Sequence, residues 1–210
     1  MFQFPKFRRS QHTMKRMYNH IAGFYGSIEK SLGPNLDSVV EEKISKIPDI
    51  SKSAALEYCC GSGLFTLKTA PHFKSVTAKD QSTAMLERAK KRAKDAGITN
   101  ITFDEGNVLE INEQPKSYDY VFISFALHLF PLEKEIEILK KLYSVAKKAV
   151  IIIDHNRKWG LPIAIVEWFE GSYYDKFIKT DFNEVARQIG CKSFNEEEID
   201  ECMVLTFYCN

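Results

Sequence analysis

The chain lacks several features that would assign it to common classes of protein. Its five cysteines include no pair at Cys-x-x-Cys spacing, and an odd number of cysteines fits reduced thiols better than a set of disulfides. No stretch approaches the ~20 consecutive apolar residues of a membrane-spanning helix, and the N-terminus has no continuous apolar segment typical of a signal peptide. These absences predict a cytoplasmic protein without a stable membrane anchor.

An excess of charge of either sign is also missing. Lys and Arg number 29 against 28 Asp and Glu, which gives a formal net charge of +1 at pH 7. We therefore expect no nucleic-acid partner, although a local basic patch could still exist. Phe and basic residues alternate in residues 1–9, a segment that could touch a membrane surface. We favour a flexible arm or one that packs as part of a lid.

The 210 residues contain no repeat, no low-complexity segment and no evident linker, and they fit one globular domain with a sizeable core. Apolar strand-like runs alternate with helical patterns, which predicts an α/β fold with a parallel sheet covered by helices on both faces. The expected strands are residues 54–58, 75–79, 101–103, 118–124, 149–154 and 203–208.

Three helices can be placed by their end signals and apolar spacing. Ser82 is expected to cap a helix that Gly97 ends, with Met85, Leu86, Ala89 and Ala93 on one face. Pro131 begins the next helix, whose expected inward residues are Ile136, Leu139, Leu142 and Ala146. Residues 181–189 form the third.

The most informative segment is residues 54–63, AALEYCCGSG, which predicts a strand, a glycine turn and the start of a helix. In that arrangement backbone N–H groups can approach a nucleotide-like ligand, and Asp80, at the end of the next strand, can accept hydrogen bonds from a ribose diol. Thr66 stands where a dinucleotide site needs a third small residue, and Glu57 would repel a pyrophosphate but attract an amino group. The pattern therefore favours a nucleoside with a cationic end over a nicotinamide dinucleotide.

Four segments in order resemble motifs of the class I S-adenosylmethionine (SAM)-dependent methyltransferases, especially its small-molecule and quinone methyltransferases: residues 56–63, 76–86, 103–108 and 118–128. The resemblance implies SAM as cofactor, S-adenosylhomocysteine (SAH) as product and a small-molecule methyl acceptor. It also implies a Rossmann-like α/β fold, with a seven-stranded, mostly parallel sheet of order 3-2-1-4-5-7-6, the last strand antiparallel and helices on both faces.

The resemblance also assigns cofactor-binding residues. Asp80 would hold the ribose hydroxyls, Gln81 and Met85 would flank the adenine, and Asn107 and the backbone of Val108 would meet the adenine edge. The remaining residues of the implied cofactor site are Tyr18 in a lid helix, Glu57, Cys59, Gly61 and Gly63 in the first motif, and Ser124.

Cys59 departs from the family, which usually has a glycine at this position. A cysteine is strained there if the backbone needs a positive φ, and tolerable if only a small side chain is needed. We expect the second, because Gly61 and Gly63 remain for the sharper part of the turn. Cys59 also keeps an alternative function open, a noncatalytic nucleoside- or partner-binding domain on the same fold.

Methyl transfer from a sulfonium is an in-line displacement, so holding the acceptor close and excluding water should matter more than any catalytic group. His128 follows the fourth strand and Asp154 ends the fifth, where strand ends face the ligand in an open α/β sheet. We expect His128 to deprotonate or polarise the acceptor, and Asp154, together with His155, to orient it, the alternative being a structural role for each. No metal is expected, because Cys59 and Cys60 have no further ligands at suitable spacing.

Aromatic residues suggest where the acceptor binds. Trp168, Tyr173 and Tyr174 lie in a predicted helical insertion after the fifth strand, and Tyr25 lies near Tyr18 in the lid segment. They suit an apolar or planar acceptor, although each could simply pack the core. The single domain is thus expected to have three parts: lid helices in 1–50, a cofactor-binding core in 51–154, and an acceptor-side insertion with a C-terminal hairpin in 155–210.

Overall fold

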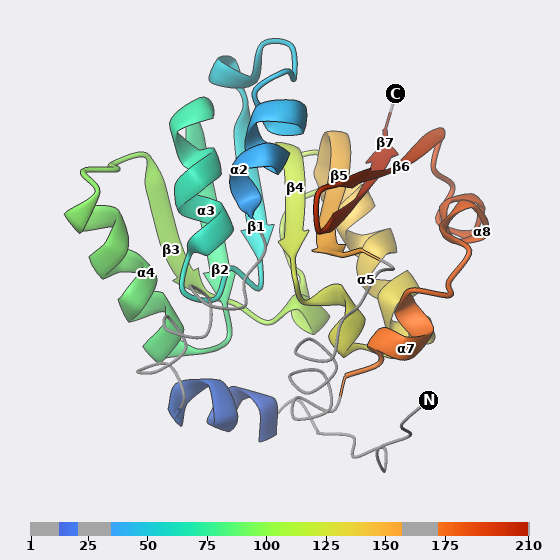
Figure 1. Cartoon of the computed structure of the whole chain (residues 1–210), viewed down its shortest axis with the longest axis horizontal. Helices are drawn as coiled ribbons and strands as arrows, with labels where there is room; N and C mark the ends of the chain where they lie inside the picture. Colours follow the sequence, from blue (N-terminus) through green and yellow to red (C-terminus); the bar gives the residue numbers. More distant parts are fainter. Residues whose placement is uncertain (1–12, 21–34, 157–171, 210) are drawn as a thin grey trace.

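The computed structural model describes residues 13–20, 35–156 and 172–209. A seven-stranded sheet of order β3-β2-β1-β4-β5-β7-β6 forms its centre (Figure 1). Strands β1 to β5 run in parallel, and β7 is antiparallel to both β5 and β6. This topology confirms the expected sheet. The strands are β1 Ala54–Tyr58, β2 Ser75–Asp80, β3 Ile101–Glu105, β4 Tyr118–Ser124, β5 Ala146–His155, β6 Ser193–Ile199 and β7 Cys202–Tyr208.

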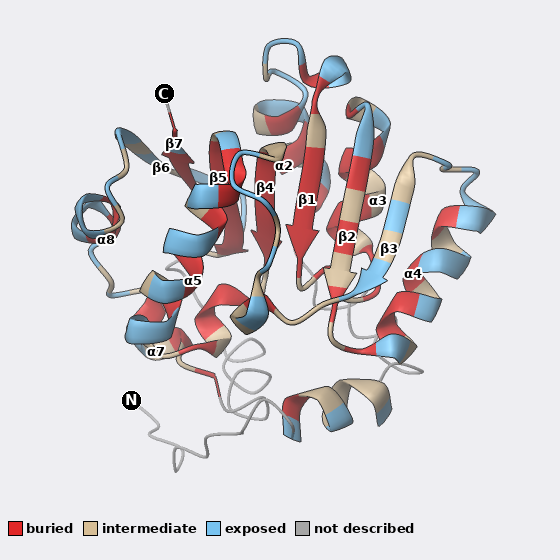
Figure 2. Cartoon of the chain, turned by 180° about the vertical axis from the view of Figure 1, so that it is seen from behind, coloured by how far each residue is buried: buried red, intermediate tan, exposed pale blue. Residues whose placement is uncertain are grey.

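Helices pack on both faces of the sheet. One apolar core lies between the sheet and α2 and α3, and a second lies between the sheet and α5, α7 and α8. The central strands are almost wholly buried, whereas the edge strand β3 is largely exposed (Figure 2). The helices are α2 Leu36–Val39, α3 Leu64–Thr69, α4 Thr83–Asp95, α5 Leu132–Val145, α7 Tyr174–Phe177 and α8 Phe182–Gln188. Shorter turns of 3-10 or π helix are Val40–Ile44, Ile50–Lys52, Ala70–His72, Val108–Glu110 and Leu127–Leu129.

The helix ends follow the expected signals. The hydroxyl of Ser82 accepts the backbone N–H of Met85 at 3.2 Å and so caps α4, which ends shortly before Gly97 with its positive φ of 68°. Pro131 precedes α5, but the buried face of α5 differs from the expected one. Ile136 is only partly buried, and Glu135 and Ile138 lie inward instead.

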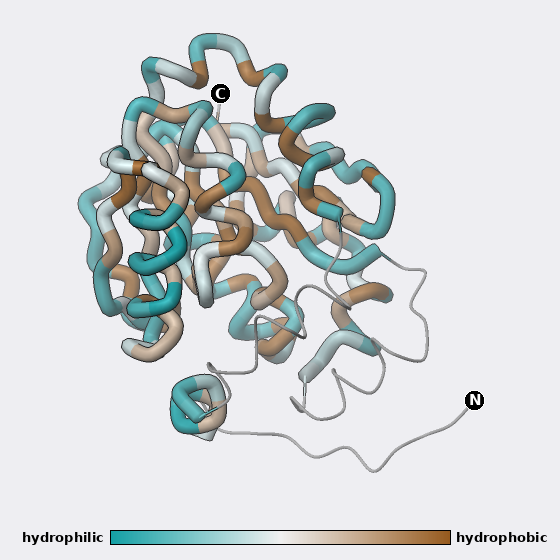
Figure 3. The backbone as a smooth tube through the Cα atoms, turned by 60° about the vertical axis from the view of Figure 1, so that its left-hand side comes forward, coloured by the Kyte–Doolittle hydropathy of each residue, from teal (hydrophilic) through white to brown (hydrophobic). Residues whose placement is uncertain are grey.

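Residues 13–20 form a helix that lies beyond the carboxyl ends of the parallel strands (Figure 1 and Figure 3). It occupies the side of the sheet on which ligands bind in open α/β folds. The predicted arm in residues 1–9, Tyr25, and residues 158–171 of the predicted insertion lie outside the described residues. Across the described ranges, no helix has the length and apolar character needed to cross a membrane.

Candidate active site

Asp80 connects the glycine turn to the start of α4. Its Oδ2 accepts the backbone N–H of Gly61 at 2.9 Å, and its Oδ1 accepts that of Ser82 at 2.8 Å. Burial raises the pKa of this carboxyl, and the backbone donors oppose that shift. Each carboxylate oxygen still has lone-pair capacity for another donor. Asp80 therefore lies between the turn after β1 and the start of α4, the position expected of a ribose-binding carboxylate.

The two glycines of the turn serve different purposes. A Cβ on Gly63 would lie 2.6 Å from Leu67 Cδ1 and 3.0 Å from the Cβ of Ala89, so close packing against α4 requires a glycine. A Cβ on Gly61 would meet nothing within 4 Å, and its φ is +52°. The turn is thus tight against α4 at Gly63 and open at Gly61, which leaves room for a ligand to approach the backbone.

Cys59 has a φ of 59°, so the expectation that its position needs only a small side chain is wrong. A left-handed conformation costs an L-residue about 1–2 kcal/mol. Phe125 has a φ of 48° and follows β4, the strand that pairs with β1, so strained residues end two neighbouring strands. Burial, with the nearby charges of Asp80 and Glu57, raises the thiol pKa of Cys59 well above its usual value. The thiol therefore stays protonated and poorly suited to act as a nucleophile or metal ligand.

Glu57 is buried in β1 with both carboxyl oxygens bonded. The hydroxyl of Thr66 donates to Oε2 at 2.5 Å, and the hydroxyl of Ser124 donates to Oε1 at 2.7 Å. The pKa of Glu57 is raised to about 7, mainly by burial and also by the charge of Asp80, against the opposing effect of the two donors. The sequence indicated Thr66 only as a mismatch to a dinucleotide motif. Its contact with Glu57, nine residues earlier, was not predicted.

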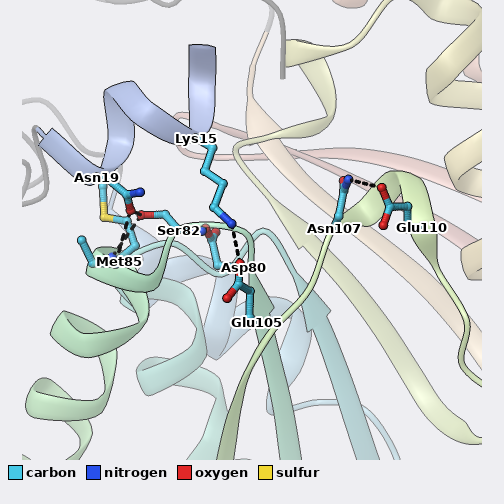
Figure 4. A network of polar contacts seen from close by, with 9 residues as sticks. Lys15, Asn19, Asp80, Ser82, Met85, Glu105, Asn107 and Glu110 are labelled. Carbon is cyan, nitrogen blue, oxygen red and sulfur yellow. Dashed lines mark hydrogen bonds and ion pairs between the residues drawn. The ribbon is translucent and has the colours of Figure 1, made fainter. Parts of the chain in front are cut away.

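The expected adenine-binding residues follow the carboxyl ends of β2 and β3. Met85 and Val108 are buried, and Gln81 is partly exposed. The side chain of Asn107 caps the short turn after β3 by accepting the N–H of Leu109 at 3.1 Å, and its amide donates to Glu110 at 3.1 Å (Figure 4). An adenine amino group that donates to Asn107 Oδ1 would have to share this acceptor with the N–H of Leu109 or replace that bond.

The helix of residues 13–20 contacts this cofactor side through residues that the sequence did not reveal. Asn19 Oδ1 accepts the hydroxyl of Ser82 at 2.6 Å, and Lys15 forms an ion pair with Glu105 (Figure 4). Lys15 and Asn19 are four residues apart and so share a helix face, which is the only local signal of their role. Tyr18, the expected lid residue, lies between Lys15 and Asn19 in the sequence and is half-buried.

The part of the site where we expect the acceptor, called the acceptor side below, contains His128 and Asp154. His128 Nδ1 lies 2.7 and 2.8 Å from the two oxygens of Asp154, and both side chains are almost completely buried. The backbone N–H of His155 donates to Asp154 Oδ1 at 2.8 Å. Burial lowers the pKa of the His155 imidazole to about 4, so this ring is neutral at pH 7. The structure thus pairs the two residues that the sequence suggested separately.

Aromatic rings surround this pair. Tyr174 lies edge-on to His128 with 5.7 Å between ring centroids, and Phe177 lies at 6.1 Å. Tyr174 is buried and donates its hydroxyl to the carbonyl of Asn156 at 2.6 Å, whereas the backbone N–H of Tyr173 donates to the His128 carbonyl at 2.8 Å. Tyr25 and Trp168, the other expected acceptor residues, lie outside the described residues.

Glu135 is a buried acid that the sequence analysis missed. It is 2% exposed, and its Oε2 has no hydrogen-bond partner among the described residues. Its pKa is raised to about 8, mainly by burial and also by the charge of Asp154, whereas His128 opposes the shift. Its spacing from Leu139 and Leu142 on the inward face of α5 was the available signal. In the described ranges no group of three or more His, Cys, Asp or Glu could hold a metal ion.

Comparisons with a protein family, with curated proteins and with solved structures all find methyltransferases. Residues 55–149 match the family described as methyltransferase domain. The demethylmenaquinone methyltransferase of Listeria welshimeri is 24% identical over 141 residues, 65% of this chain and 59% of that protein. The chain thus spans about three fifths of the length of the first curated relatives it matches.

Solved structures share the fold at low sequence identity. Magnesium protoporphyrin IX methyltransferase from Synechocystis PCC 6803, solved with bound SAH, aligns with a TM-score of 0.68 and 16% identity over 94% of this chain and all of that one. A SAM-dependent methyltransferase from Aquifex aeolicus aligns with a TM-score of 0.66 and 19% identity over 88% of this chain and 98% of that one. Residues 55–149 are thus similar to a methyltransferase domain, and the sheet order and these solved structures show that the chain has the fold of the S-adenosylmethionine-dependent methyltransferases.

Proposed function

We propose that this protein transfers the methyl group of SAM to a small-molecule acceptor by in-line displacement. The observation that carries the proposal is the arrangement of two polar centres along one edge of the sheet. Asp80 ends β2, and the His128–Asp154 pair lies at the carboxyl ends of β4 and β5. A cofactor held by the first centre would direct its methionine end toward the second across β1 and β4.

In the proposed complex Asp80 accepts the ribose hydroxyls, and the side chains of Gln81 and Met85 flank the adenine. Asn107 and the backbone N–H of Val108 read the adenine edge. The open side of the turn at Gly61 leaves room for the ligand, and Glu57 and Ser124 support its amino-acid end. The helix with Tyr18 covers the nucleoside.

The acceptor attacks the methyl carbon as the bond between that carbon and sulfur breaks, and the electron pair of the breaking bond stays on sulfur. An acceptor that reacts through an O–H or similar group must also lose a proton, either while the new bond forms or afterwards. Because Nδ1 of His128 faces Asp154, the proton would go to Nε2, and Asp154 would stabilise the resulting imidazolium. Proximity supplies most of the acceleration.

The acceptor is proposed to be planar and partly apolar, because aromatic rings surround His128. Several relatives carry the name demethylmenaquinone methyltransferase, so a quinone-type compound is the first acceptor to test. Tyr173, Tyr174, Tyr25 and Trp168 are proposed to line its side of the site.

Calorimetric titration with SAM and SAH tests the cofactor assignment. Removing a hydrogen-bond partner of a charged group typically costs about 1.5–3 kcal/mol, so Asp80→Ala should weaken binding by roughly 10- to 150-fold. Asp95→Ala, an exposed aspartate at the end of α4, is the matched control and should bind as wild type does. Affinity for a nicotinamide dinucleotide with none for SAM would overturn the assignment. Binding without turnover of any acceptor would favour the noncatalytic alternative.

A further inference from the structure

Glu57 is a buried acid at a position where the proposed ligand brings a positive charge. It lies in the central strand β1, 1% exposed, next to the turn that contains Gly61. Among the described residues, the charged side chain that shifts the pKa of Glu57 is Asp80, which is also an acid. The thiols of Cys59 and Cys60 are its other titratable neighbours. In the absence of ligand, the two hydroxyl donors Thr66 and Ser124 stabilise a negative charge on Glu57, but no positively charged side chain among the described residues acts on it.

The hydrogen bonds of Glu57 accommodate either protonation state. Thr66 on α3 and Ser124 at the end of β4 each present a hydroxyl, and a hydroxyl can donate or accept. An ionised Glu57 accepts both bonds. A protonated Glu57 donates to one hydroxyl, which then turns its own proton elsewhere. The carboxyl can therefore gain or lose a proton without any movement of the backbone.

We propose that cofactor binding drives a proton off Glu57, so that the occupied site holds a carboxylate opposite the α-ammonium group of the ligand. This inference rests on the proposed function, which places the amino-acid end of SAM at this point. The proton passes from the carboxyl to bulk water or buffer, and no other bond changes.

The direction of the effect follows from burial and charge. A buried carboxyl beside another acid is hard to ionise, and the pKa of Glu57 near 7 leaves it about half protonated at neutral pH. An opposite charge within a few ångströms typically lowers the pKa of a carboxyl by about 1–3 units. Glu57 would then be ionised in the complex. Below pH 7 the affinity should fall, approaching a tenfold loss per pH unit.

Proton release can be measured by titrating the protein with SAH at pH 7 in buffers of different ionisation enthalpy. The slope of the observed enthalpy against the buffer enthalpy gives the number of protons released, which we expect to be about one half. Methylthioadenosine has the nucleoside without the amino-acid end and should bind without releasing this proton. Glu57→Gln should bind SAH with no release, whereas the exposed Glu87→Gln should release as wild type does.

Ser124→Ala provides a second variant that keeps the acid. It removes one donor to the carboxylate, which raises the pKa of the free protein's Glu57 and should increase the proton release at pH 7. SAH binding without release by wild type, or equal release by Glu57→Gln or on binding methylthioadenosine, would overturn this inference and leave the proposed function intact. Failure of SAH to bind at all would instead overturn the proposed function.

Discussion

The two halves of the proposed site differ in how their buried polar groups are bonded. On the cofactor side, both oxygens of Asp80 and both oxygens of Glu57 accept hydrogen bonds from nearby donors. On the acceptor side, Glu135 Oε2 and His155 Nδ1 have no hydrogen-bond partner among the described residues. The cofactor half is thus largely preorganised, whereas the acceptor half holds polar groups whose bonding is incomplete in the described chain.

This difference has a physical consequence for each half. A preorganised site binds without reorganising, so its residues should affect ligand affinity. A buried polar group without a partner costs stability, and such groups persist where function requires them. We therefore expect cofactor-side changes to alter binding, and acceptor-side changes to alter turnover or stability.

The largest expected effect comes from His128→Ala, which would separate the two halves most clearly. A positioned base typically contributes a factor of about 100–10,000, so turnover should fall by that order while the affinity for SAH stays within about twofold. Steady-state kinetics with an identified acceptor and calorimetry measure the two quantities. His72→Ala, at the opposite end of β2, serves as control. Unchanged turnover would reduce His128 to a structural residue.

Glu135→Leu tests whether a buried acid on the acceptor side lowers the free energy of unfolding. The pKa of Glu135 is about 8 in the folded protein against an ordinary 4.5, so the unfolded chain loses this proton at lower pH than the folded one. The stability of wild type should therefore fall as the pH rises from about 5 to 8. We expect the variant to be more stable by ~1–3 kcal/mol at pH 8, with a smaller difference at pH 5.

Denaturant unfolding at both pH values measures this effect. Glu133→Leu, an exposed position on the same helix, should not reproduce it. A Glu135→Leu protein that is less stable than wild type at pH 8 would mean that the carboxylate has a stabilising partner, and the contrast between the halves would fail.

The N-terminal helix should contribute to cofactor affinity through a few contacts. Asn19→Ala removes the acceptor for the Ser82 hydroxyl, and a neutral hydrogen bond is worth about 0.5–1.5 kcal/mol, so SAH binding should weaken by roughly 2- to 12-fold. Tyr18→Ala should also act mainly on binding, through lost packing. Unchanged SAH affinity in both variants, measured by calorimetry, would exclude this helix from the cofactor site.

Cys59→Gly should give the smallest effect, a slight gain in stability. Glycine removes a left-handed strain of about 1–2 kcal/mol but adds about 0.5–1 kcal/mol of backbone entropy to the unfolded chain. A net gain of about 0.5 kcal/mol in stability, with SAH bound at least as well as by wild type, is expected from unfolding and binding measurements. A marked loss of binding would show that the thiol has a role of its own.

The cofactor half was predictable because its signals are local. Residues 54–63 and Asp80 lie within one strand-turn-helix-strand unit, and the predicted limits of β1 and β4 match the structure. The φ of Cys59 was mispredicted, because that backbone is set by closure of the turn. The N–H of Cys60 donates to the carbonyl of Lys79 on the neighbouring strand at 3.0 Å, and these two residues are far apart in the sequence.

The acceptor half was less predictable because its contacts are long-range. His128 and Asp154 were each identified by their position at a strand end, but their pairing depends on the register of β4 against β5. The rotation of α5 decides that Glu135 rather than Ile136 is buried, and apolar spacing alone favoured Ile136. Sequence patterns indicate which residues share a helix face, but packing against the sheet decides which face is buried.

A crystal structure of the protein with bound SAH tests the central claim most directly. The account predicts the ribose hydroxyls within hydrogen-bond distance of the Asp80 carboxylate, the adenine beside Met85 and Asn107, and the sulfur on the side of β4 that faces His128. A nucleoside bound elsewhere, or bound with its sulfur directed away from the His128–Asp154 pair, would contradict it.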